Sequence, residues 1–347
     1  MNPISITIII LSLTGGTIIA ISGHHWIAAW LGLELNTLAI IPLMIKPPHP
    51  RAAEATTKYF LVQTTGSAMM MFSSILNAWM NGDWIVLIGL NPLSTFFLTM
   101  ALAIKLGMAP FHFWMPDVIQ GLTLPTSLVL ATWMKLPPVA ILTQLSPSLN
   151  LELMLSMAVL STLSGGWGGI NQTQLRKILA YSSIAHLGWV AAAVKLCPKL
   201  ALLNFFVYTV LTSALFLTFI ILKTTNMSQL TKAWSNSPML ILATLLTLLS
   251  LAGLPPLAGF LPKWLVIQEL VKQDLPALAM MLLLSTLLSL FFYLRLAYIM
   301  LLMIAPNSVF SAPKWKPSTK FYVAIPITLS VIMAISYPLI KTFLLET

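Results

Sequence analysis

Charged residues are scarce in this sequence, and cysteine is almost absent. Lys, Arg, Asp and Glu together make up 7% of the 347 residues, whereas 58% of the residues are hydrophobic. Soluble domains carry about 25% charged residues, so this composition predicts a multi-pass helical membrane protein. The single cysteine, Cys197, excludes an intrachain disulfide and any all-cysteine metal or cluster site within this chain.

Several other signals are missing. The net charge is +10, but no basic stripe alternates with aromatic residues, so nucleic acid is not an expected partner. The Met-Asn-Pro start has no basic n-region and no transit-peptide composition, so residues 3–22 are expected to remain as the first spanning helix. The glycine-rich run 165–169 follows no strand and lacks the spacing of a dinucleotide loop. His24, His25 and His49 have no partners at metal-ligand spacing. The sequence therefore predicts no cofactor and no metal bound by this chain.

Apolar tracts predict an all-α fold of about eleven transmembrane helices, two of them discontinuous. The predicted spans are 3–22, 25–45, 57–80, 92–110, 124–145, 149–170, 175–195, 199–222, 238–272 with a break, 276–304 and 321–345. The segment 111–123 is apolar but too short to cross a bilayer, so it fits the second half of another interrupted helix. Loops are short, and we interpret 1–347 as a single transmembrane domain.

The two predicted breaks relate the halves of the chain. In each, a Gly/Pro interruption adjoins a lysine, Lys105 in the fourth span and Lys263 in the ninth. Five spans separate them, so the matching elements run in opposite directions, as in an inverted repeat. We interpret 1–145 and 149–304 as the two inverted five-helix halves, and 305–347 as a loop and a C-terminal helix.

The distribution of Lys and Arg predicts orientation. Ten cations lie on the side of the N-terminus: Lys46, Arg51, Lys58, Arg176, Lys177, Lys223, Lys232, Lys314, Lys316 and Lys320. Four lie on the other side: Lys195, Lys199, Lys272 and Lys341. The N-terminus is therefore expected on the cytoplasm-like side, which is the matrix in a mitochondrion.

The stretch 251–264 carries three prolines and two glycines and then presents Lys263. These residues cannot continue a helical hydrogen-bond ladder, and freed backbone at membrane depth is tolerated only beside protein or a water-filled cavity. The alternative is a proline kink whose lysine reaches for the interface.

Six ionisable residues fall near the centres of predicted spans or beside the breaks. At about 1.5 Å rise per residue they lie within several ångströms of one membrane depth. They are Glu34, Lys105, Lys135, His186 and Lys263, with His112 as a further candidate. Buried ion pairs that only fix packing are the alternative, and a neutral histidine can simply hydrogen-bond a neighbouring helix. Ionisable residues inside a membrane more often mark ion pathways or proton relays.

The chemistry that such a row supports is proton transfer. Burial disfavours the charged form of a lysine and a nearby carboxylate favours it, so Lys105 beside Glu34 would hold a proton until that influence moved away. Histidines between lysines, with Tyr181, Ser182 and Ser183 nearby in sequence, would carry protons through bound water. No redox chemistry is visible in the residues.

Three motifs carry a resemblance to a known family. They are Lys-Leu-Gly-Met-Ala-Pro-Phe-His-Phe-Trp-Met-Pro-Asp at 105–117, Tyr-Ser-Ser-Ile-Ala-His-Leu-Gly at 181–188 and Gly-Leu-Pro-Pro-Leu-Ala-Gly-Phe-Leu-Pro-Lys at 253–263. In this order, with Glu34 upstream, they resemble the antiporter-like subunits of respiratory complex I over nearly the whole chain. Bacterial members are expected to have fourteen helices, so eleven would fit loss of three N-terminal helices, as in animal mitochondrial forms.

The resemblance implies a role for each residue. Glu34 and Lys105 would form the charge pair of a first half-channel, with His112 beside the first break. Lys135 would link this pair to His186 on a central axis. Lys263 would face the exit half-channel.

The resemblance also implies surroundings. NADH, FMN, iron–sulfur clusters and ubiquinone would be bound elsewhere in complex I, an NADH dehydrogenase (ubiquinone) of the respiratory electron transport chain. Partners would be its other core and accessory subunits, including neighbouring antiporter-like subunits, together with membrane lipids and protons. The location would be the mitochondrial inner membrane, with the N-terminus in the matrix and the C-terminus in the intermembrane space.

Three hypotheses compete. The first is a proton-translocating subunit driven by remote redox chemistry. The second is a stand-alone, Mrp-like cation/proton antiporter, for which the same relay would serve. The third is a structural membrane-arm subunit whose charges are vestigial ion pairs.

Overall fold

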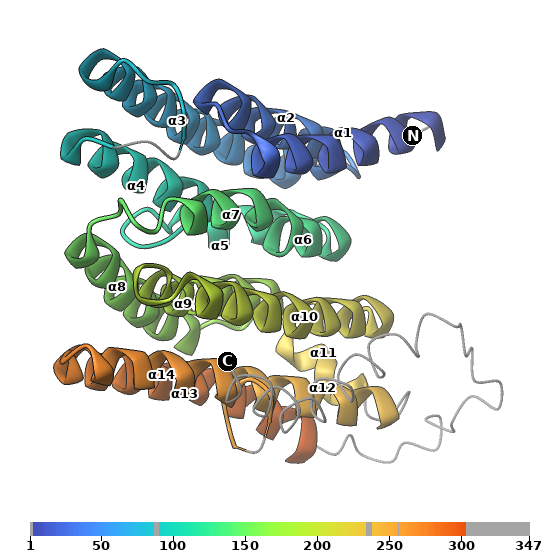
Figure 1. Cartoon of the computed structure of the whole chain (residues 1–347). Helices are drawn as coiled ribbons and strands as arrows, with labels where there is room; N and C mark the ends of the chain where they lie inside the picture. Colours follow the sequence, from blue (N-terminus) through green and yellow to red (C-terminus); the bar gives the residue numbers. More distant parts are fainter. Residues whose placement is uncertain (1–2, 87–89, 234–237, 256, 303–347) are drawn as a thin grey trace, which may run out of the picture. The chain divides into compact units, whose positions relative to one another are not determined.

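The regular structure of the chain is helical. The computed structural model describes residues 3–86, 90–233, 238–255 and 257–302 (Figure 1). These ranges contain no strand, although isolated bridges join His25 to Ile85 and Gln174 to Asn226. Helices satisfy their backbone hydrogen bonds internally, which an apolar medium requires. The predicted all-α membrane fold is confirmed.

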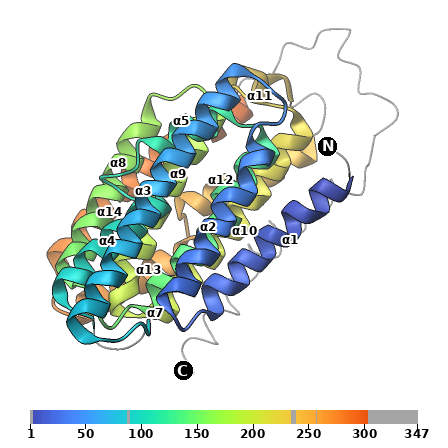
Figure 2. The same cartoon turned by 90° about the horizontal axis from the view of Figure 1, so that it is seen from above.

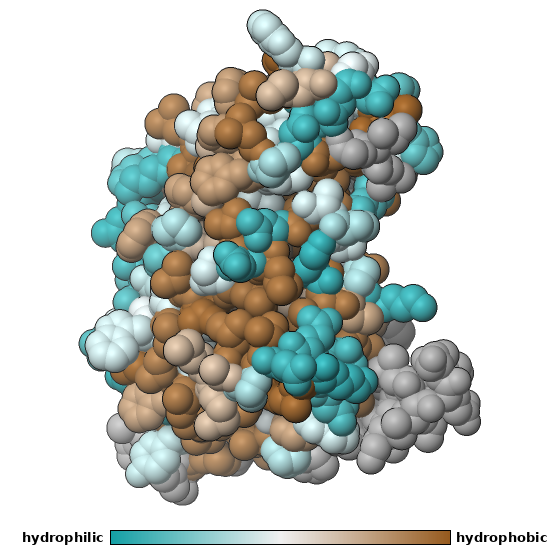
Figure 3. Space-filling view, turned by 60° about the vertical axis from the view of Figure 1, so that its left-hand side comes forward, coloured by the Kyte–Doolittle hydropathy of each residue, from teal (hydrophilic) through white to brown (hydrophobic). Residues whose placement is uncertain are grey.

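The described helices coincide with ten of the predicted spans, and the eleventh span, 321–345, lies outside the described residues. Within these ranges, seven helical segments are long and apolar enough to cross a membrane, and two further apolar helices are shorter. Large hydrophobic side chains cover broad areas of the surface (Figure 3), as lipid-facing residues do.

The chain divides into two compact units. Unit 1 comprises Met1–Ser161 and Val190–Leu202, and unit 2 comprises Thr162–Trp189 and Leu203–Thr347. The division into halves at 145–149 stays a prediction.

Unit 1 begins with long helices and continues with shorter pieces. In order these are α1 (Pro3–Ser22), α2 (Trp26–Met44), α3 (Pro50–Asn81), α4 (Pro92–Leu106), α5 (Trp114–Gly121), α6 (Leu124–Ala131), a 3₁₀ turn (Trp133–Lys135) and α7 (Leu136–Gln144). The predicted break in the fourth span is therefore the interval between α4 and α5.

Glycine allows α1 and α2 to approach each other closely. The two helices lie side by side (Figure 1, Figure 2). A Cβ on Gly32 would lie 2.5 Å from the backbone nitrogen of Ala20 and 2.8 Å from the carbonyl oxygen of Gly16. Small residues permit such backbone approach between membrane helices.

Helix α3 is the longest at 32 residues, yet it is not among the strongly apolar segments. Its buried residues include Gln63, Ser67, Ser74 and Asn77. The Oδ1 atom of Asn77 accepts hydrogen bonds from the backbone N–H of Asn91 at 3.3 Å and from the Ser94 hydroxyl at 3.4 Å. The low hydropathy of α3 thus reflects a polar face turned toward protein.

Unit 2 contains the remaining helices, of which α8 to α10 also extend into unit 1. They are α8 (Leu151–Ile170), α9 (Leu175–Leu196), α10 (Pro198–Leu222), α11 (Met227–Ala233), α12 (Pro238–Ala252), α13 (Phe260–Lys272) and α14 (Pro276–Leu302). The predicted break in the ninth span is the interval between α12 and α13.

The glycine-rich run 165–169 is a packing surface of unit 2. A Cβ on Gly165 would lie 2.7 Å from the backbone nitrogen of Ala185 in α9. A Cβ on Gly169 would lie 2.8 Å from the ring of Phe292 in α14. The run lies inside α8 and brings it close to two neighbouring helices.

We expect Gly32→Ala to destabilise the protein by about 1–3 kcal/mol, because backbone atoms of α1 cannot make room for the added methyl group. Gly15→Ala is the matched control, since nothing lies within 4 Å of a Cβ there. Thermal unfolding of the purified protein in detergent measures both. Equal losses of stability in the two variants would contradict the close packing of α1 on α2.

Candidate functional site

Lys105 lies in the last turn of α4, where the helix ends inside unit 1. Gly107 has a φ of +73°, which favours glycine, and its N–H donates to the carbonyl of Ile104 at 3.2 Å. The N–H of Met108 donates to the carbonyl of Ala103 at 3.0 Å. This pair of bonds is the Schellman motif that closes many helices. Lys105 is 6% exposed.

A small cavity adjoins Lys105. Its volume, measured as the space open to the centres of water molecules, is about 20 Å³, and a water needs roughly 10–15 Å³. Its polar lining consists of Asn36, Thr37, Tyr59, Gln63, Lys105, Trp114 and Lys135. The structure thus brings Lys105 and Lys135 to one cavity.

Gln63 of α3 holds the end of α4 beside this cavity. Its Nε2 atom donates to the backbone carbonyl of Lys105 at 3.3 Å. That carbonyl belongs to the last helical turn, where α4 provides no N–H partner. Gln63 therefore satisfies backbone that the break leaves free, and its side chain also contributes to the polar lining.

Lys135 lies in the 3₁₀ turn between α6 and α7 and is 3% exposed. The sequence predicts one continuous helix over 124–145, and this interruption is an addition to the two predicted breaks. Pro137 and Pro138 lack N–H groups, so they cannot bond the carbonyls four residues earlier, at Trp133 and Met134. The N–H of Leu136 bonds the carbonyl of Trp133 instead, which tightens the turn. In the sequence, the Pro137-Pro138 pair was the signal that could have predicted this interruption.

Glu34 lies on α2 beside the lysine site. It is half-buried, and its Oε2 atom is buried without a hydrogen-bond partner. Its charge interacts with that of Lys105, but no ion pair within 4.0 Å joins these two described residues. The predicted charge pair is therefore an interaction at longer range in this structure.

His112 lies between α4 and α5 and is 9% exposed. Its ring centroid is 4.2 Å from that of Phe113. His112 does not line the cavity of Lys105 and Lys135.

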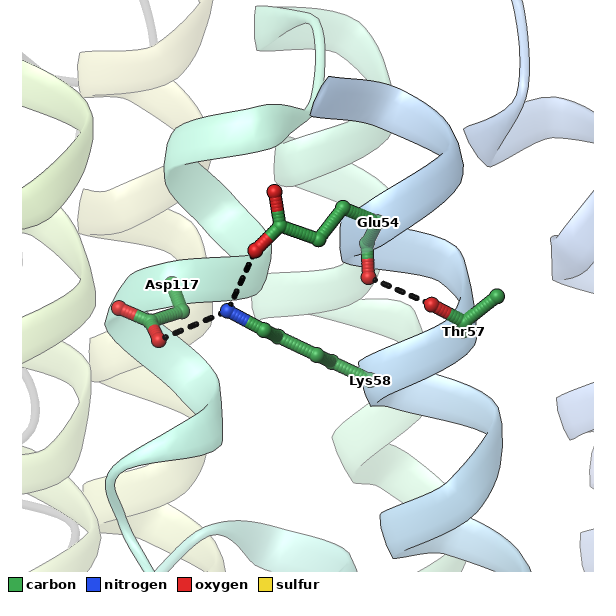
Figure 4. A network of polar contacts seen from close by, with 4 residues as sticks. All are labelled: Glu54, Thr57, Lys58 and Asp117. Carbon is green, nitrogen blue, oxygen red and sulfur yellow. Dashed lines mark hydrogen bonds and ion pairs between the residues drawn. The ribbon is translucent and has the colours of Figure 1, made fainter. Parts of the chain in front are cut away.

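An exposed ionic cluster joins α3 to α5 (Figure 4). The Nζ atom of Lys58 lies 2.8 Å from Oε1 of Glu54 and 3.4 Å from Oδ2 of Asp117. These residues line a surface pocket of about 240 Å³ together with Arg51 and Gln120. The cluster tethers α5, whose first residue lines the lysine cavity, to the start of α3.

His186 lies on α9 in unit 2 and is 7% exposed. Its Nε2 atom is 3.4 Å from the hydroxyl of Tyr293 on α14, and its ring centroid is 5.3 Å from that of Tyr208 on α10. Tyr208 also hydrogen-bonds Ser183, and Tyr293 hydrogen-bonds Ser182. The histidine therefore belongs to a buried cluster of hydroxyl groups from three helices.

Lys263 lies in the first turn of α13 in unit 2 and is 7% exposed. Its Nζ atom donates to the backbone carbonyls of Leu251 at 3.2 Å and Ala252 at 3.0 Å. The lysine thus faces the end of α12 across the predicted break.

Sequence reasoning missed several residues that the structure adds to these sites. They are Asn36, Thr37, Tyr59, Gln63 and Trp114 around the lysine cavity, and Tyr208 and Tyr293 around His186. Polar residues in apolar helices were the available signal, but their partners depend on how helices pack. Across the described residues, no group of three or more His, Cys, Asp or Glu side chains has the arrangement of a metal site.

Comparisons with known proteins agree on one family. The model of the family described as NADH:quinone oxidoreductase/Mrp antiporter, transmembrane, matches residues 23–289. A protein of Xenopus laevis is 53% identical over 320 residues, which cover 92% of this chain and 93% of that protein. One of Squalus acanthias is 55% identical over 316 residues and 91% of each chain. Both are named NADH-ubiquinone oxidoreductase chain 2.

Solved structures show the same fold. A chain of respiratory complex I from Thermus thermophilus with bound aureothin is 25% identical, with a TM-score of 0.86 over 97% of this chain and 78% of that chain. A chain of the Mrp complex from Dietzia sp. DQ12-45-1b is 16% identical, with a TM-score of 0.82 over 97% and 75%. The second likeness concerns the fold alone.

We expect Gln63→Leu to destabilise the protein by about 1–3 kcal/mol, because it leaves the buried Lys105 carbonyl without its side-chain donor. Thermal unfolding in detergent measures the effect. Gln120→Leu, at the rim of the exposed pocket, is the control and should change stability less. An unchanged unfolding temperature for Gln63→Leu would contradict the capping role.

The exposed cluster predicts a small pH dependence of stability. Lys58 lowers the pKa of the Glu54 carboxyl from its ordinary value of 4.5, through a hydrogen bond and then through its charge. A lowered folded-state pKa contributes stability above the unfolded-state pKa, and this contribution is lost as the pH falls through the folded-state value. Glu54→Gln should therefore lower the unfolding temperature slightly at neutral pH and leave it unchanged in acid. Glu152→Gln, at an exposed carboxylate outside the cluster, is the control, and a pH-independent difference for Glu54→Gln would contradict the assignment.

Proposed function

Because this chain belongs to the NADH:quinone oxidoreductase/Mrp antiporter transmembrane family, we propose that it is a proton-translocating membrane-arm subunit of a respiratory NADH:ubiquinone oxidoreductase. In this role it relays protons through Glu34, Lys105, Lys135, His186 and Lys263, driven by redox chemistry in other subunits. The observation that carries the proposal is the cavity that Lys105 and Lys135 share.

The cavity supports proton transfer in unit 1 in two ways. Its volume suits a water molecule, and a water hydrogen-bonded to both amines would provide a path for a proton between them. Two ammonium charges on one small cavity also repel each other, so the two lysines do not hold protons independently. Glu34 adds a negative charge beside Lys105, which opposes this repulsion. A change in any one of these three charges therefore changes the electrostatic interactions of the other two groups.

The groups in unit 2 are suited to the same task. His186 both donates and accepts hydrogen bonds, and the Tyr293 hydroxyl at its Nε2 atom does so too. Lys263 presents a buried amine at a break in a helix. We propose that these groups continue the relay and that His112, beside the first break, is an accessory group.

The proposal assigns the redox cofactors to other subunits. NADH, FMN, iron–sulfur clusters and ubiquinone would bind elsewhere, and this chain would bind none of them. Its partners would be the other core and accessory subunits, including neighbouring antiporter-like subunits, with lipid on the exposed apolar faces. The names of the relatives support this placement.

We propose a location that the same relatives and the charge distribution support. We place this multi-pass chain in the mitochondrial inner membrane. The excess of Lys and Arg on the side of the N-terminus supports an N-terminus in the matrix and a C-terminus in the intermembrane space.

A stand-alone cation/proton antiporter is the second candidate, favoured by the fold shared with the Mrp complex. Proton transport by the purified chain in liposomes, dependent on a sodium or potassium gradient and on no other subunit, would favour this function. A structural role is the third, and under it substitutions of the buried lysines should impair assembly and electron transfer in parallel.

We expect Lys263→Ala and Glu34→Gln to lower the number of protons pumped per electron in the assembled complex. A group that transfers a proton contributes roughly 10²–10⁴-fold to the rate, so transfer through this subunit should fall by at least about 10²-fold. Acidification measured in proteoliposomes against NADH oxidation reports the ratio.

Lys199→Ala, at an exposed lysine, is the control and should leave the ratio unchanged. An unchanged ratio in both Lys263→Ala and Glu34→Gln, with the complex intact, would contradict the proposed relay.

A further inference from the structure

The end of α12 leaves four backbone carbonyls without partners inside the helix. Two of them are satisfied by a Schellman motif. The N–H of Gly253 donates to the carbonyl of Ser250 at 3.0 Å, and the N–H of Leu254 donates to the carbonyl of Leu249 at 3.3 Å. The carbonyls of Leu251 and Ala252 remain, and the motif has no donor for them.

Lys263 supplies the two missing donors. Its Nζ atom donates to both remaining carbonyls, at 3.2 and 3.0 Å. The amine thus completes the cap of a helix that is not its own, since it projects from α13. It also lies at the negative end of the α12 dipole, which favours a cation. These contacts hold the side chain in one place.

Gly253 provides the space for this contact. Its φ is +85°, in the left-handed region that favours glycine. A Cβ at this position would lie 2.9 Å from the Nζ atom of Lys263 and 3.1 Å from its Cδ atom. The first distance is shorter than real Cβ contacts and the second is tighter than most of them, so a side chain at 253 would push the amine away from its two carbonyls.

The first break has the same cap but different neighbours. Gly107 ends α4 with a similar φ, and a Cβ there would meet the ring of Trp114 at 3.1 Å. The carbonyl left free at Lys105 accepts a hydrogen bond from Gln63. A side-chain amide therefore supports the end of α4, whereas an ionisable amine supports the end of α12.

We propose that Gly253 is a positioning residue for Lys263, an inference that rests on the proposed proton relay. Because Gly253 has no side chain, two N–H groups of the amine can donate hydrogen bonds to the carbonyls of Leu251 and Ala252. An ammonium has three such donors. The third position faces away from these carbonyls and holds either a transferable proton or, after release, the lone pair that accepts the next one. The amine then keeps one orientation in its protonated and its neutral state. It therefore donates a proton from the same position at which it accepts the next one.

A double-mutant cycle in the assembled complex tests the proposal. The variants are Gly253→Ala, Lys263→Ala and the two combined, with protons pumped per electron as the readout. A misplacement of about 1 Å can cost a transfer step roughly 10²-fold, so Gly253→Ala, which pushes the amine away from its carbonyls, should lower the ratio below the wild-type value and at most as far as Lys263→Ala does. A wild-type ratio in Gly253→Ala would overturn the proposal. The double variant should be no worse than Lys263→Ala alone, because Gly253 acts through that lysine. A further loss in the double variant would overturn the proposal.

Gly82→Ala is the matched control for backbone strain. Gly82 caps α3 with a φ of +78°, and nothing lies within 4 Å of a Cβ there. The number of protons pumped per electron in Gly82→Ala should stay at the wild-type value. A fall equal to that in Gly253→Ala would overturn the proposal. Gly253→Asn serves if Gly253→Ala does not assemble, because asparagine tolerates the left-handed conformation and carries the same Cβ.

A cryo-electron microscopy map of the Gly253→Ala or Gly253→Asn complex separates this inference from the relay itself. The map should show the Lys263 amine moved away from the carbonyls of Leu251 and Ala252. An amine that still contacts both carbonyls would overturn the role of Gly253, whatever the pumping ratio. If Lys263→Ala alone leaves the ratio unchanged, the relay fails, and the map still decides whether Gly253 places the lysine.

Discussion

The requirement that every buried backbone N–H and C=O find a partner governs this structure. In an apolar medium no water can replace a missing hydrogen bond, so a helix that stops inside the protein must have its last carbonyls satisfied by other groups. Glycine at 107 and 253 allows the tight caps, Gln63 supports the first break, and Lys263 supports the second. Each interruption is stable because hydrogen-bond donors satisfy the backbone carbonyls that it leaves free.

The same requirement places polar and ionisable side chains at the breaks. Groups that satisfy freed backbone are polar, so a broken helix gathers amides, hydroxyls and amines in a protein that is otherwise apolar. Around Lys105 this leaves a cavity the size of a water molecule, which Lys135 also lines from its own 3₁₀ turn. An interrupted helix is thus both a structural problem and the means by which ionisable groups are kept inside a membrane protein.

Small and polar residues on helix faces decide how closely the elements approach. Gly32 lets α2 contact the backbone of α1, and the glycines of α8 do the same toward α9 and α14. The polar face of α3 turns toward α4, where Asn77 accepts hydrogen bonds from residues at the start of that helix. The last of these contacts fixes the start of α4, one of the two broken helices.

Much of the fold was determined by the sequence alone. Apolar tracts of membrane-spanning length set the helices, and clustered glycine and proline set the two predicted breaks, because both effects are local to a few turns of chain. The tertiary structure decided the rest. Lys105 and Lys135 share a cavity, Tyr293 meets His186 from 107 positions away, and Glu34 interacts with Lys105 without forming a close ion pair. These relations depend on the rotation and packing of separate helices, which no local pattern of residues specifies.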